Sequence, residues 1–464
     1  MQFPMFSFLA RLLGDPKSNL YGSAHFLGRR AKSKVLSSSN DGLVIDGVKR
    51  VSFERSCQHV AIEGKTGSGK TAGYIIPNLL NLSGNSSAVV TDYNGKIYAK
   101  TAAYLASIGY AIKIVNFSQF SHSLHFNPLA RASTFAEIMQ VSDAIIDTAY
   151  PTASGDQVFW NNGAKTIINI LIRYLQSRPA KERNLYSVLH LLDMFGENQT
   201  TIDDMMRAGL DNPTFAKYLS FFNDNEKTIS GMLSSAKMAL VALNDPDIAH
   251  FTSFDTLNFE SLRDQDTALF IIVNATDVKY YNFILTLLYS QIFSFCSQAP
   301  KPKSKDNPIY FLLDEAGNMG KIPALATSIT TLRDRKCPIS LLFQDKRQLV
   351  QQYGEQDALT IYNGCRTQIY FSGLGLETCK YISETLGKTT ITHREQGYSK
   401  TLDDSANRDK ETGRDLMTVD EIRCMGDNEI IVIISNLRPM KLKIKLYFQN
   451  RGLMKKTCPH PLFK

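Results

Sequence analysis

Residues 59–81, HVAIEGKTGSGKTAGYIIPNLLN, decide the fold of this chain. Three glycines crowd into six residues there, and Lys70 and Thr71 follow at once. Each glycine would cost a regular helix or strand about 0.5–1 kcal/mol. The apolar run before them predicts a short buried strand, and the run after them predicts the start of a helix. The glycines therefore belong to a loop that joins a strand to a helix.

This loop has the spacing G-x-x-x-x-G-K-[ST], which is typical of a phosphate-binding loop. Its backbone N–H groups turn inward around nucleotide phosphates, and the positive end of the following helix adds to the attraction. Lys70 is expected to reach the β- and γ-phosphates, and Thr71 to hold Mg²⁺ through its hydroxyl. The predicted cofactors are ATP and Mg²⁺, and the predicted ATP contacts are Gly64, Lys65, Thr66, Gly67, Ser68, Gly69, Lys70 and Thr71.

An acidic pair further along the chain completes such a site. Asp314 and Glu315 end the apolar run IYFLLDEAG, so Asp314 is expected to hold the water shell of Mg²⁺ and Glu315 to polarise the attacking water. The pair favours ATP hydrolysis over binding alone. Gln344 ends the next strand-like run and is a candidate sensor of the γ-phosphate. Arg333 and Arg335, just upstream, are surface charges or fingers toward a neighbouring subunit.

Strand-like and helix-like runs alternate on both sides of these motifs, which predicts an α/β fold with a parallel-centred sheet. Between them lies a long stretch of helical periodicity. We expect the chain to divide into an N-terminal segment that lies near a membrane or docks and begins the nucleotide-binding domain, that domain itself in two parts, and an all-α domain inserted between those parts. The respective residues are 1–50, 51–127 with 264–464, and 128–263.

Three further segments carry expectations. Residues 392–415 are almost devoid of apolar side chains and predict a mobile loop. The runs 428–435 and 440–448 are expected to close the sheet or form a hairpin. In the inserted domain, Phe159 and Trp160 are expected to pack in the core, and the domain itself to recognise cargo, because inserted surface elements commonly carry recognition.

Composition is that of a folded protein of two or three domains: 464 residues, of which 43% are hydrophobic and 21% charged. The net charge of +8 permits an anionic partner without establishing one. Seven dispersed cysteines indicate reduced thiols, with neither a disulfide frame nor a zinc site. His122 and His125 are interpreted as loop or core residues. No run reaches the ~18 apolar residues that span a bilayer.

From about Gly22 to Phe448 the chain resembles the type IV secretion coupling proteins, the TraG-like ATPases of conjugation and effector export. The similarity rests on many short matches in one order: YGSAHF, the phosphate loop with IIPNLLN, VVTDYNGK, FNPL, FWNNGAKTII, LLDEAGNMGKIP, FQDKRQL, YISETLGKTT and LMTVDEIRCMGDNEIIVIISNLRPM. The chain departs from the family at 93–96, where Tyr-Asn-Gly-Lys replaces the usual Pro-Lys-Gly-Glu. It also departs in having no N-terminal membrane helices, which predicts either their removal or docking on a membrane protein.

The resemblance implies a RecA-like motor domain, interrupted by an all-α domain, that assembles as a hexamer at the cytoplasmic face of the bacterial inner membrane. It implies partners as well: single-stranded DNA with a relaxase, or protein effectors, and the components of a type IV secretion channel. Lys70 and Thr71 match the family's Walker A pair. Asp314 and Glu315 match the Walker B pair, and Gln344 matches the glutamine after the next strand. The resemblance places the trans-acting arginine finger at Arg333, with Arg335 as the second candidate.

Two other functions share these features. An FtsK-like DNA translocase or packaging ATPase would carry the same motor residues, but the helical insertion and the segment LMTVDEIR argue against it. A non-hydrolysing platform for cargo recruitment would be suggested by the loss of Lys70 or Glu315, and both are present. The segment from 438 to 464 holds eight basic residues and no acidic one, and is interpreted either as a lysine-protected edge strand or as a DNA contact.

Overall fold

The computed structural model describes residues 19–151, 153–195, 199–322, 325–396 and 407–457. Within these ranges, nine strands form one sheet in the order β11-β10-β7-β1-β6-β5-β2-β4-β3. Neighbours from β7 to β3 run parallel, whereas β10 is antiparallel to both β7 and β11. The strands are β1 (Val60–Glu63), β2 (Ser87–Tyr93), β3 (Ala111–Asn116), β4 (Thr267–Val273), β5 (Ile309–Leu313), β6 (Ile339–Phe343), β7 (Thr367–Tyr370), β10 (Glu429–Ile434) and β11 (Met440–Lys443). The predicted α/β fold class is confirmed, and the last two apolar runs form a hairpin that extends the sheet.

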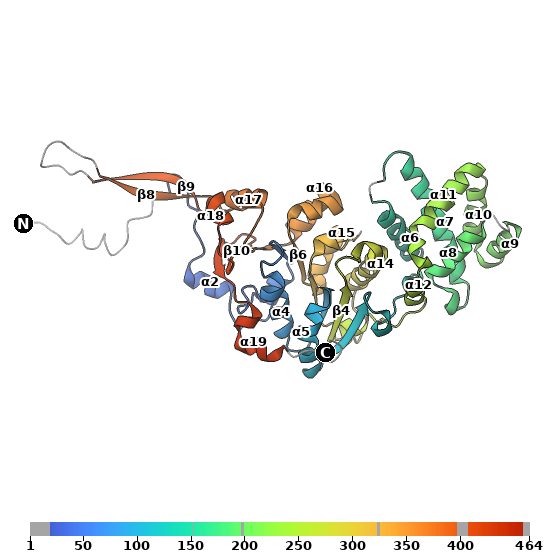
Figure 1. Ribbon diagram of the computed structural model, residues 1–464, viewed down its shortest axis with the longest axis horizontal. Coiled ribbons are helices and arrows are strands. Elements are labelled where there is room, and N and C mark those ends of the chain that lie inside the picture. Colours follow the sequence, from blue (N-terminus) through green and yellow to red (C-terminus); the bar gives the residue numbers. More distant parts are fainter. Residues whose placement is uncertain (1–18, 152, 196–198, 323–324, 397–406, 458–464) are drawn as a thin grey trace, which may run out of the picture.

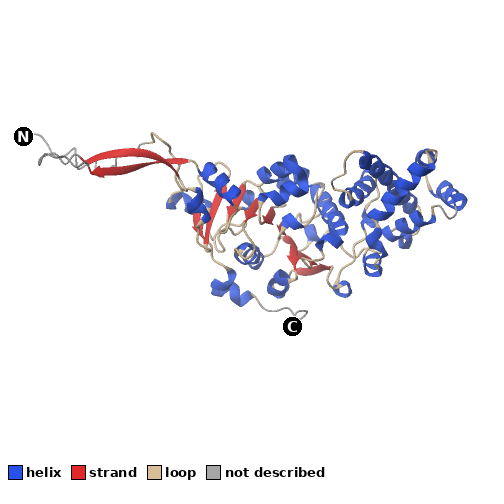
Figure 2. Cartoon of the chain, turned by 45° about the horizontal axis from the view of Figure 1, so that its top comes forward, coloured by secondary structure: helices blue, strands red, loops and turns tan. Residues whose placement is uncertain are grey.

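Helices cover both faces of this sheet (Figures 1 and 2). Successive residues of β1 alternate between the faces, with Ala61 in one core and Val60 and Ile62 in the other. One face packs against η1 (Thr71–Ile75), α4 (Ile76–Leu80) and α5 (Lys96–Ser107). The other packs against α14 (Val278–Ser297), α15 (Leu325–Thr331) and α16 (Lys346–Gly364). In the part of the chain that the structure describes, no helix is long and apolar enough to cross a bilayer.

Between β3 and β4 the described residues form only helices and turns, as the inserted all-α domain requires. We call this group the helical body: α6 (Phe135–Ala149), α7 (Asp156–Gln176), α8 (Leu185–Met194), α9 (Gln199–Gly209), α10 (Asn212–Phe222), α11 (Glu226–Ala239) and α12 (Pro246–Phe251). It lies at one end of the molecule (Figure 1), and its core continues into that of the α14 face of the sheet. The domain boundaries themselves stay predictions.

The expectation for Phe159 is wrong. This side chain is 51% exposed, because on α7 it shares a face with the exposed Asn162 and Thr166. Trp160, one position on, is partly buried, and its ring lies 2.7 Å from where a Cβ on Gly231 would stand. A helical period of 3.6 residues turns neighbouring side chains about 100° apart, so these two aromatic residues have different environments.

The mobile loop predicted over residues 392–415 is also wrong where the structure describes it. Strands β8 (Lys388–Gln396) and β9 (Asn407–Asp415) pair antiparallel into a two-stranded ribbon that projects from the body (Figures 1 and 2). The prediction was misled by the low apolar content. A ribbon exposed on both faces has no buried face, so its strands do not show the alternation of apolar and polar residues by which a strand is recognised in a sequence. Residues 397–406 lie outside the described residues. At the base of the ribbon, Ser23 pairs with Thr389 of β8.

The remaining helices flank the motor sheet and the ribbon. They include α17 (Leu376–Leu386), whose end at Gly387 leads directly into β8. The others are α2 (Arg29–Val35), α3 (Phe53–Ser56), α13 (Ser261–Asp264), α18 (Val419–Arg423) and α19 (Arg451–Lys456). Thus α17 joins the motor sheet to the ribbon without an intervening element.

Candidate nucleotide-binding site

The loop after β1 has the backbone that a phosphate-binding loop needs. Gly67 and Gly69 have φ of +83° and +90°, the left-handed region that costs side-chain-bearing residues energy. At Gly64 a Cβ would lie 2.7 Å from both Phe371 Cβ and Ser68 Oγ. Local backbone geometry therefore requires two of these glycines and close packing requires the third.

A continuous helix follows, from Thr71 to Leu80, and its first turn is a wide π-turn. Pro77 explains the widening, because it has no N–H to donate to the carbonyl of Gly73 and its ring crowds that carbonyl. No side chain in the described residues caps the start of this helix. The N–H of Gly73 already donates to the carbonyl of Gly69 at 2.7 Å, so the N–H groups before it are the ones expected to bond to phosphate oxygens.

Walker A and Walker B residues meet at the carboxyl edge of the parallel strands. Thr71 Oγ1 donates to Asp314 Oδ2 at 2.9 Å, and Lys70 Nζ lies 3.9 Å from Glu315 Oε1. In the sheet only β6 lies between β1 and β5, so the carboxyl ends of β1 and β5 lie close together. Lys70 Nζ also donates to the carbonyl of Gly64, and to that of Lys65 at 3.2 Å.

Burial shifts the pKa values of this cluster. It raises the pKa of Asp314 to about 6, against the hydrogen bond from Thr71 and the charge of Lys70. Burial also lowers the pKa of Lys70, and the nearby carboxylates Glu315 and Asp314 oppose that shift. Removing these charges from water is costly unless they pair with each other or with a ligand.

Glu315 and Gln344 are held together at the end of the site. The backbone of Glu315 is left-handed, with φ 46° and ψ 42°. A residue with a side chain keeps such a conformation only where its surroundings impose it, and these cases cluster at functional sites. Gln344 Nε2 donates to Glu315 Oε2 at 3.1 Å. The candidate sensor therefore contacts the candidate water-activating residue directly.

Sequence reasoning missed the residues that brace this pair. Gln348, on the first turn of α16, accepts from the N–H of Gln344 at 2.9 Å and donates to Asn318 Oδ1 at 3.2 Å. The N–H of Asn318 in turn donates to the carbonyl of Glu315 at 2.8 Å. Gly317 permits this approach, because a Cβ there would lie 2.5 Å from Gln348 Oε1. Gln344 and Gln348 are four residues apart in the sequence, and this spacing could have indicated that the two interact.

A second missed contact lies under the loop. Glu63, the residue before Gly64, is buried and accepts a hydrogen bond from Thr378 on α17. Burial raises the pKa of Glu63 to about 7, while the bond from Thr378 opposes the shift. Because α17 leads into β8, this contact connects the phosphate loop to the base of the ribbon.

The two arginine candidates lie elsewhere. Turn η7 (Leu332–Arg335) precedes β6, so Arg333 stands at the amino edge of the sheet, opposite the phosphate loop. Its Nε is buried and bonds to nothing in the described chain. Burial lowers the pKa of His59, at the start of β1, to about 4, and Arg333 adds to that shift. An arginine at this edge lies away from the nucleotide site of its own chain.

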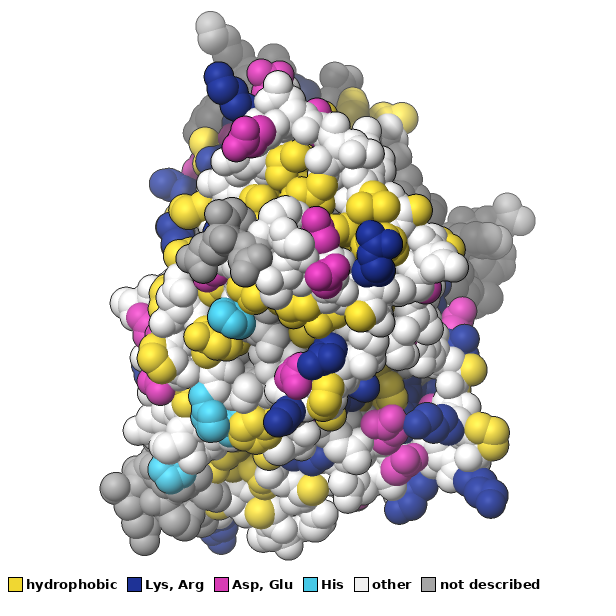
Figure 3. All heavy atoms as spheres, turned by 90° about the vertical axis from the view of Figure 1, so that its right-hand side faces the viewer, with side chains coloured by type: hydrophobic (Ala, Val, Ile, Leu, Met, Phe, Trp, Pro, Cys, Tyr) yellow, Lys and Arg dark blue, Asp and Glu magenta, His cyan; other side chains and the backbone are white. Residues whose placement is uncertain are grey.

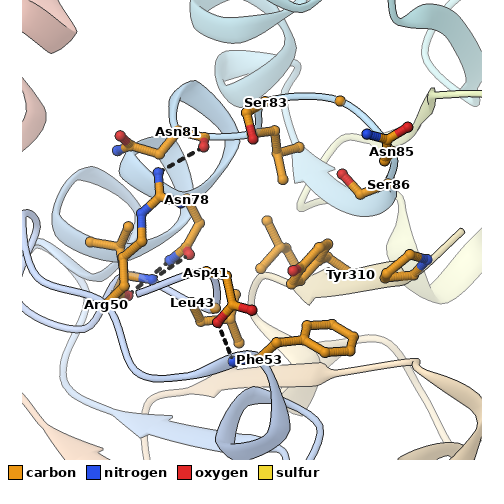
Figure 4. A pocket seen from close by; sticks show the side chains of 16 residues that line it. Asp41, Leu43, Arg50, Phe53, Asn78, Asn81, Ser83, Asn85, Ser86 and Tyr310 are labelled. Carbon is orange, nitrogen blue, oxygen red and sulfur yellow. Dashed lines mark hydrogen bonds between the residues drawn. The ribbon is translucent and has the colours of Figure 1, made fainter. Parts of the chain in front are cut away.

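A cavity of about 320 Å³ also lies at the amino edge (Figure 4). Two of its polar side chains are bonded within the chain: Arg50 Nη2 donates to the carbonyl of Asn81 at 2.9 Å, and Asp41 accepts from the N–H of Phe53 at 2.8 Å. Ser86 and Tyr310 stand near the amino ends of β2 and β5. The cavity is thus remote from the nucleotide cluster.

Of the two histidines that the sequence placed in a loop or in the core, His125 contacts neighbouring rings and His122 lies in a short turn. His125 stacks on Phe254 with ring centroids 4.0 Å apart. His122 is the last residue of the turn η2 (Phe120–His122). No group of three or more His, Cys, Asp or Glu side chains that could hold a metal ion occurs in the described ranges.

The residues of the loop and of the acidic pair fit a magnesium nucleotide. Ser68 Oγ in the loop is buried and bonds to nothing in the described chain, a group that a phosphate oxygen would satisfy. The loop also supplies a desolvated cation in Lys70. Thr71 and Asp314 supply a hydroxyl and a carboxylate at 2.9 Å, the oxygen ligands that Mg²⁺ prefers.

Residues 24–462 match the family described as type IV secretory system conjugative DNA transfer. The chain belongs to this family. It is 24% identical to the VirD4 protein of Rhizobium radiobacter over 417 residues, which cover 85% of this chain and 58% of VirD4. It is 25% identical to a conjugal transfer protein TraG of Escherichia coli over 395 residues, which cover 78% of this chain and 61% of TraG. The chain thus spans about three fifths of the length of these relatives.

Solved structures of the conjugative coupling protein TrwB have the same fold. The complex of TrwB with ADP and Mg²⁺ superposes with a TM-score of 0.70 at 16% identity, over 93% of this chain and 96% of TrwB. Its complex with a non-hydrolysable ATP analogue gives 0.70 at 15% identity over the same shares. The resemblance to coupling proteins and the RecA-like fold predicted from the sequence are confirmed.

The Gln348 brace gives a first prediction. Gln348→Leu removes both of its hydrogen bonds and frees Gln344 and Asn318, so we expect roughly tenfold slower ATP turnover, which corresponds to ~1.4 kcal/mol of barrier. ATP affinity should not change, because the side-chain hydrogen bonds of Gln348 go to Gln344 and Asn318, outside the phosphate loop. Steady-state hydrolysis and fluorescent-nucleotide binding measure the two quantities. Gln356→Leu, an exposed site on the same helix, is the control, and equal turnover in both variants would contradict the bracing role.

Proposed function

We propose that this protein is a Mg²⁺-dependent ATPase that works as the motor of a type IV secretion coupling complex. The observation that carries the proposal is the meeting of Lys70, Thr71, Asp314, Glu315 and Gln344 at one edge of a RecA-like sheet, in a chain of the conjugative DNA transfer family. TrwB, which shares the fold, is solved with ADP and Mg²⁺. The family match over residues 24–462 favours this function over an FtsK-like translocase.

The geometry gives each residue a task. Lys70 exchanges the loop carbonyls that it now contacts for the β- and γ-phosphate oxygens of ATP. Thr71 and Asp314 are the residues that would hold Mg²⁺, which supplies charge neutralisation at the phosphates. Glu315 accepts a hydrogen bond from the attacking water and orients it. Gln344, bonded to Glu315, passes the loss of the γ-phosphate to α16 through Gln348.

We also propose the assembly and the partners that the family implies. The motor works as a hexamer at the cytoplasmic face of the bacterial inner membrane. It takes up single-stranded DNA with a relaxase, or protein effectors, and delivers them to a type IV secretion channel. The helical body contacts the cargo: hydrophobic side chains gather in several groups on its outer face (Figure 3), and Phe135, Met139 and Leu219 are among the exposed ones.

Glu315→Gln tests the proposal against a platform that recruits cargo without turnover. The change removes the base that activates water but keeps the size of the side chain and a hydrogen-bond acceptor for Gln344. We therefore expect normal ATP binding with turnover slower by about 10²–10⁴-fold. Phosphate release and nucleotide binding are measured on the same preparation, with Glu355→Gln, an exposed site on α16, as control. A wild-type protein that binds ATP and shows no turnover above this variant would support the platform instead.

The basic C-terminal segment gives a prediction about nucleic acid. Lys441 pairs with Glu429 at 3.0 Å across the β10–β11 hairpin, which supports the protected-edge interpretation for that lysine, whereas Lys445 is exposed. We expect weak, sequence-independent binding of single-stranded DNA by the whole protein through counterion release. With about three phosphates neutralised, affinity should fall roughly twentyfold between 50 and 200 mM salt. Fluorescence anisotropy with oligo-dT and a mixed sequence measures it, and salt-independent binding or preference for one sequence would contradict it.

A further inference from the structure

Residues 93–96 are the place where this chain departs from the pattern of its family, and none of the tasks proposed above falls to them. Tyr93 stands in the place of the proline that is usual there. It is the last residue of β2, which lies between β5 and β4 in the sheet. The departure therefore puts an aromatic hydroxyl beside the strand that carries the acidic pair.

The register of β2 against β5 brings Tyr93 to Glu315. Thr91 pairs with Leu313 in this parallel ladder, so Tyr93, two residues on, is level with Glu315. Its phenolic O–H donates to the carbonyl of Glu315 at 3.4 Å, a long hydrogen bond between distant parts of the chain. On its other side Tyr93 pairs with Val273 of β4. The backbone that carries Tyr93 is thus held by the sheet on both sides.

Two side chains on one face of β2 contact the two ends of the turn that follows β5. We call this segment, residues 315–319, the acidic turn. Thr91 and Tyr93 are two residues apart on a strand and so point to the same face. Tyr93 contacts the carbonyl of Glu315 at the start of the turn, and Thr91 Oγ1 donates to Met319 Sδ at its end, at 3.5 Å. The acidic turn is thereby fixed to β2 as well as to the brace on α16.

Glu315 is the residue of the acidic turn whose backbone needs this support. Its φ of 46° and ψ of 42° lie in the left-handed region, which a residue with a side chain keeps only where its surroundings impose it. Its carbonyl accepts two hydrogen bonds. The one from the N–H of Asn318, at 2.8 Å, is internal to the turn and moves with it. The one from Tyr93 comes from another strand, so it fixes the carbonyl relative to the sheet.

The Tyr93 hydroxyl suits this task because it stays protonated. Burial raises the pKa of Tyr93, and the nearby Tyr289, Glu315 and Asp314 raise it further. A protonated phenol that is removed from water needs an acceptor. The carbonyl of Glu315 supplies one. A proline or a phenylalanine at this position has no hydroxyl and would leave that carbonyl without its bond to β2.

We propose that Tyr93 is a positioning residue for ATP hydrolysis, because its hydroxyl holds the Glu315 peptide so that the carboxylate faces the attacking water. The inference rests on the proposed ATPase function and gives it a residue outside the matched motifs. Tyr93 acts through Glu315, whose carboxylate accepts from Gln344 Nε2 at 3.1 Å. Without the hydroxyl the acidic turn is held less firmly, and the carboxylate is correctly placed in a smaller fraction of molecules.

Hydrogen exchange on the whole chain tests the contact without ATP. Tyr93→Phe removes the hydroxyl and keeps the ring, so the fold should persist. We expect backbone N–H exchange over residues 314–322 to become about fivefold faster, because the acidic turn opens more often. Tyr110→Phe, the matched control, removes a buried hydroxyl that bonds to Ser86 at 2.8 Å near the amino edge, and should leave this exchange unchanged. Exchange in Tyr93→Phe equal to that in the control overturns the inference, whatever turnover the wild-type protein shows.

Steady-state kinetics test the role in turnover. We expect Tyr93→Phe to lower kcat about fivefold, a modest loss that suits a bond of 3.4 Å, and to leave KM for ATP unchanged. In the Glu315→Gln background, where this side chain no longer activates water, the same change should cost less than about twofold. A second loss of similar size there, or a matching rise in KM, overturns the positioning role. A wild-type protein without turnover overturns the proposed function instead, and the exchange result still decides the contact.

Discussion

We expect that replacing Lys70 with alanine abolishes the proposed ATP hydrolysis and leaves the fold intact. Lys70 Nζ lies 3.9 Å from Glu315 and bonds to carbonyls of its own loop, so we propose it as the cation that would neutralise the phosphates as charge develops on them. Removing one such group costs at least about 10²–10³-fold in turnover. The fold should persist, because the carbonyls that Lys70 leaves behind belong to the phosphate loop and not to the cores of the sheet.

Phosphate release measures this loss, and thermal unfolding verifies the fold. Lys100→Ala, an exposed lysine on α5, is the matched control and should retain full turnover. Turnover of the purified Lys70→Ala protein equal to that of the control would contradict the assignment of the loop to a nucleotide.

Arg333→Ala should bind ATP normally and still be inactive. Arg333 lies at the amino edge of the sheet, away from its own phosphate loop, and its buried Nε has no partner in the described chain. We propose that it completes the site of the adjacent subunit, where such a finger is worth roughly 10³–10⁵ in rate in related enzymes. Turnover per subunit should then rise steeply with protein concentration.

Mixing variants separates this role from a structural one. A Lys70→Ala subunit can lend its intact Arg333 to a neighbour whose loop is intact, so mixtures of Lys70→Ala with Arg333→Ala should recover part of the activity. Arg335→Ala, at the second candidate, is tested in the same mixtures. The carbonyl of Arg335 accepts from Arg263 Nη2 at 2.8 Å, a backbone contact that this substitution leaves in place. Mixtures that co-assemble and recover nothing would exclude Arg333 as a trans-acting residue.

The sequence predicted those features that depend on neighbours in the chain. The glycines, Lys70 and Thr71 form one local motif, and the apolar runs before it and before Asp314 place both motifs at strand ends. Because parallel strands present their carboxyl ends at one edge, the meeting of Thr71 with Asp314 at 2.9 Å followed from these two local readings.

Contacts between distant segments were beyond this reasoning. The hydrogen bond from Thr378 to Glu63 depends on where α17 packs. The polar ribbon depends on pairing between β8 and β9, and neither strand has the alternation of apolar residues that a buried face would require. Phe159 and Trp160 point about 100° apart on α7, and which of them faces the core depends on how the whole helix packs.

The most direct test of the motor assignment is Mg²⁺-dependent ATP hydrolysis by the wild-type protein, measured over a range of protein concentrations with and without single-stranded DNA. The geometry of Lys70, Asp314 and Glu315, with Arg333 on the opposite edge, predicts hydrolysis that requires Mg²⁺ and rises per subunit as concentration increases. Single-stranded DNA should increase it further by favouring assembly. ATP that binds and is not hydrolysed at any concentration, with or without DNA, would contradict the assignment.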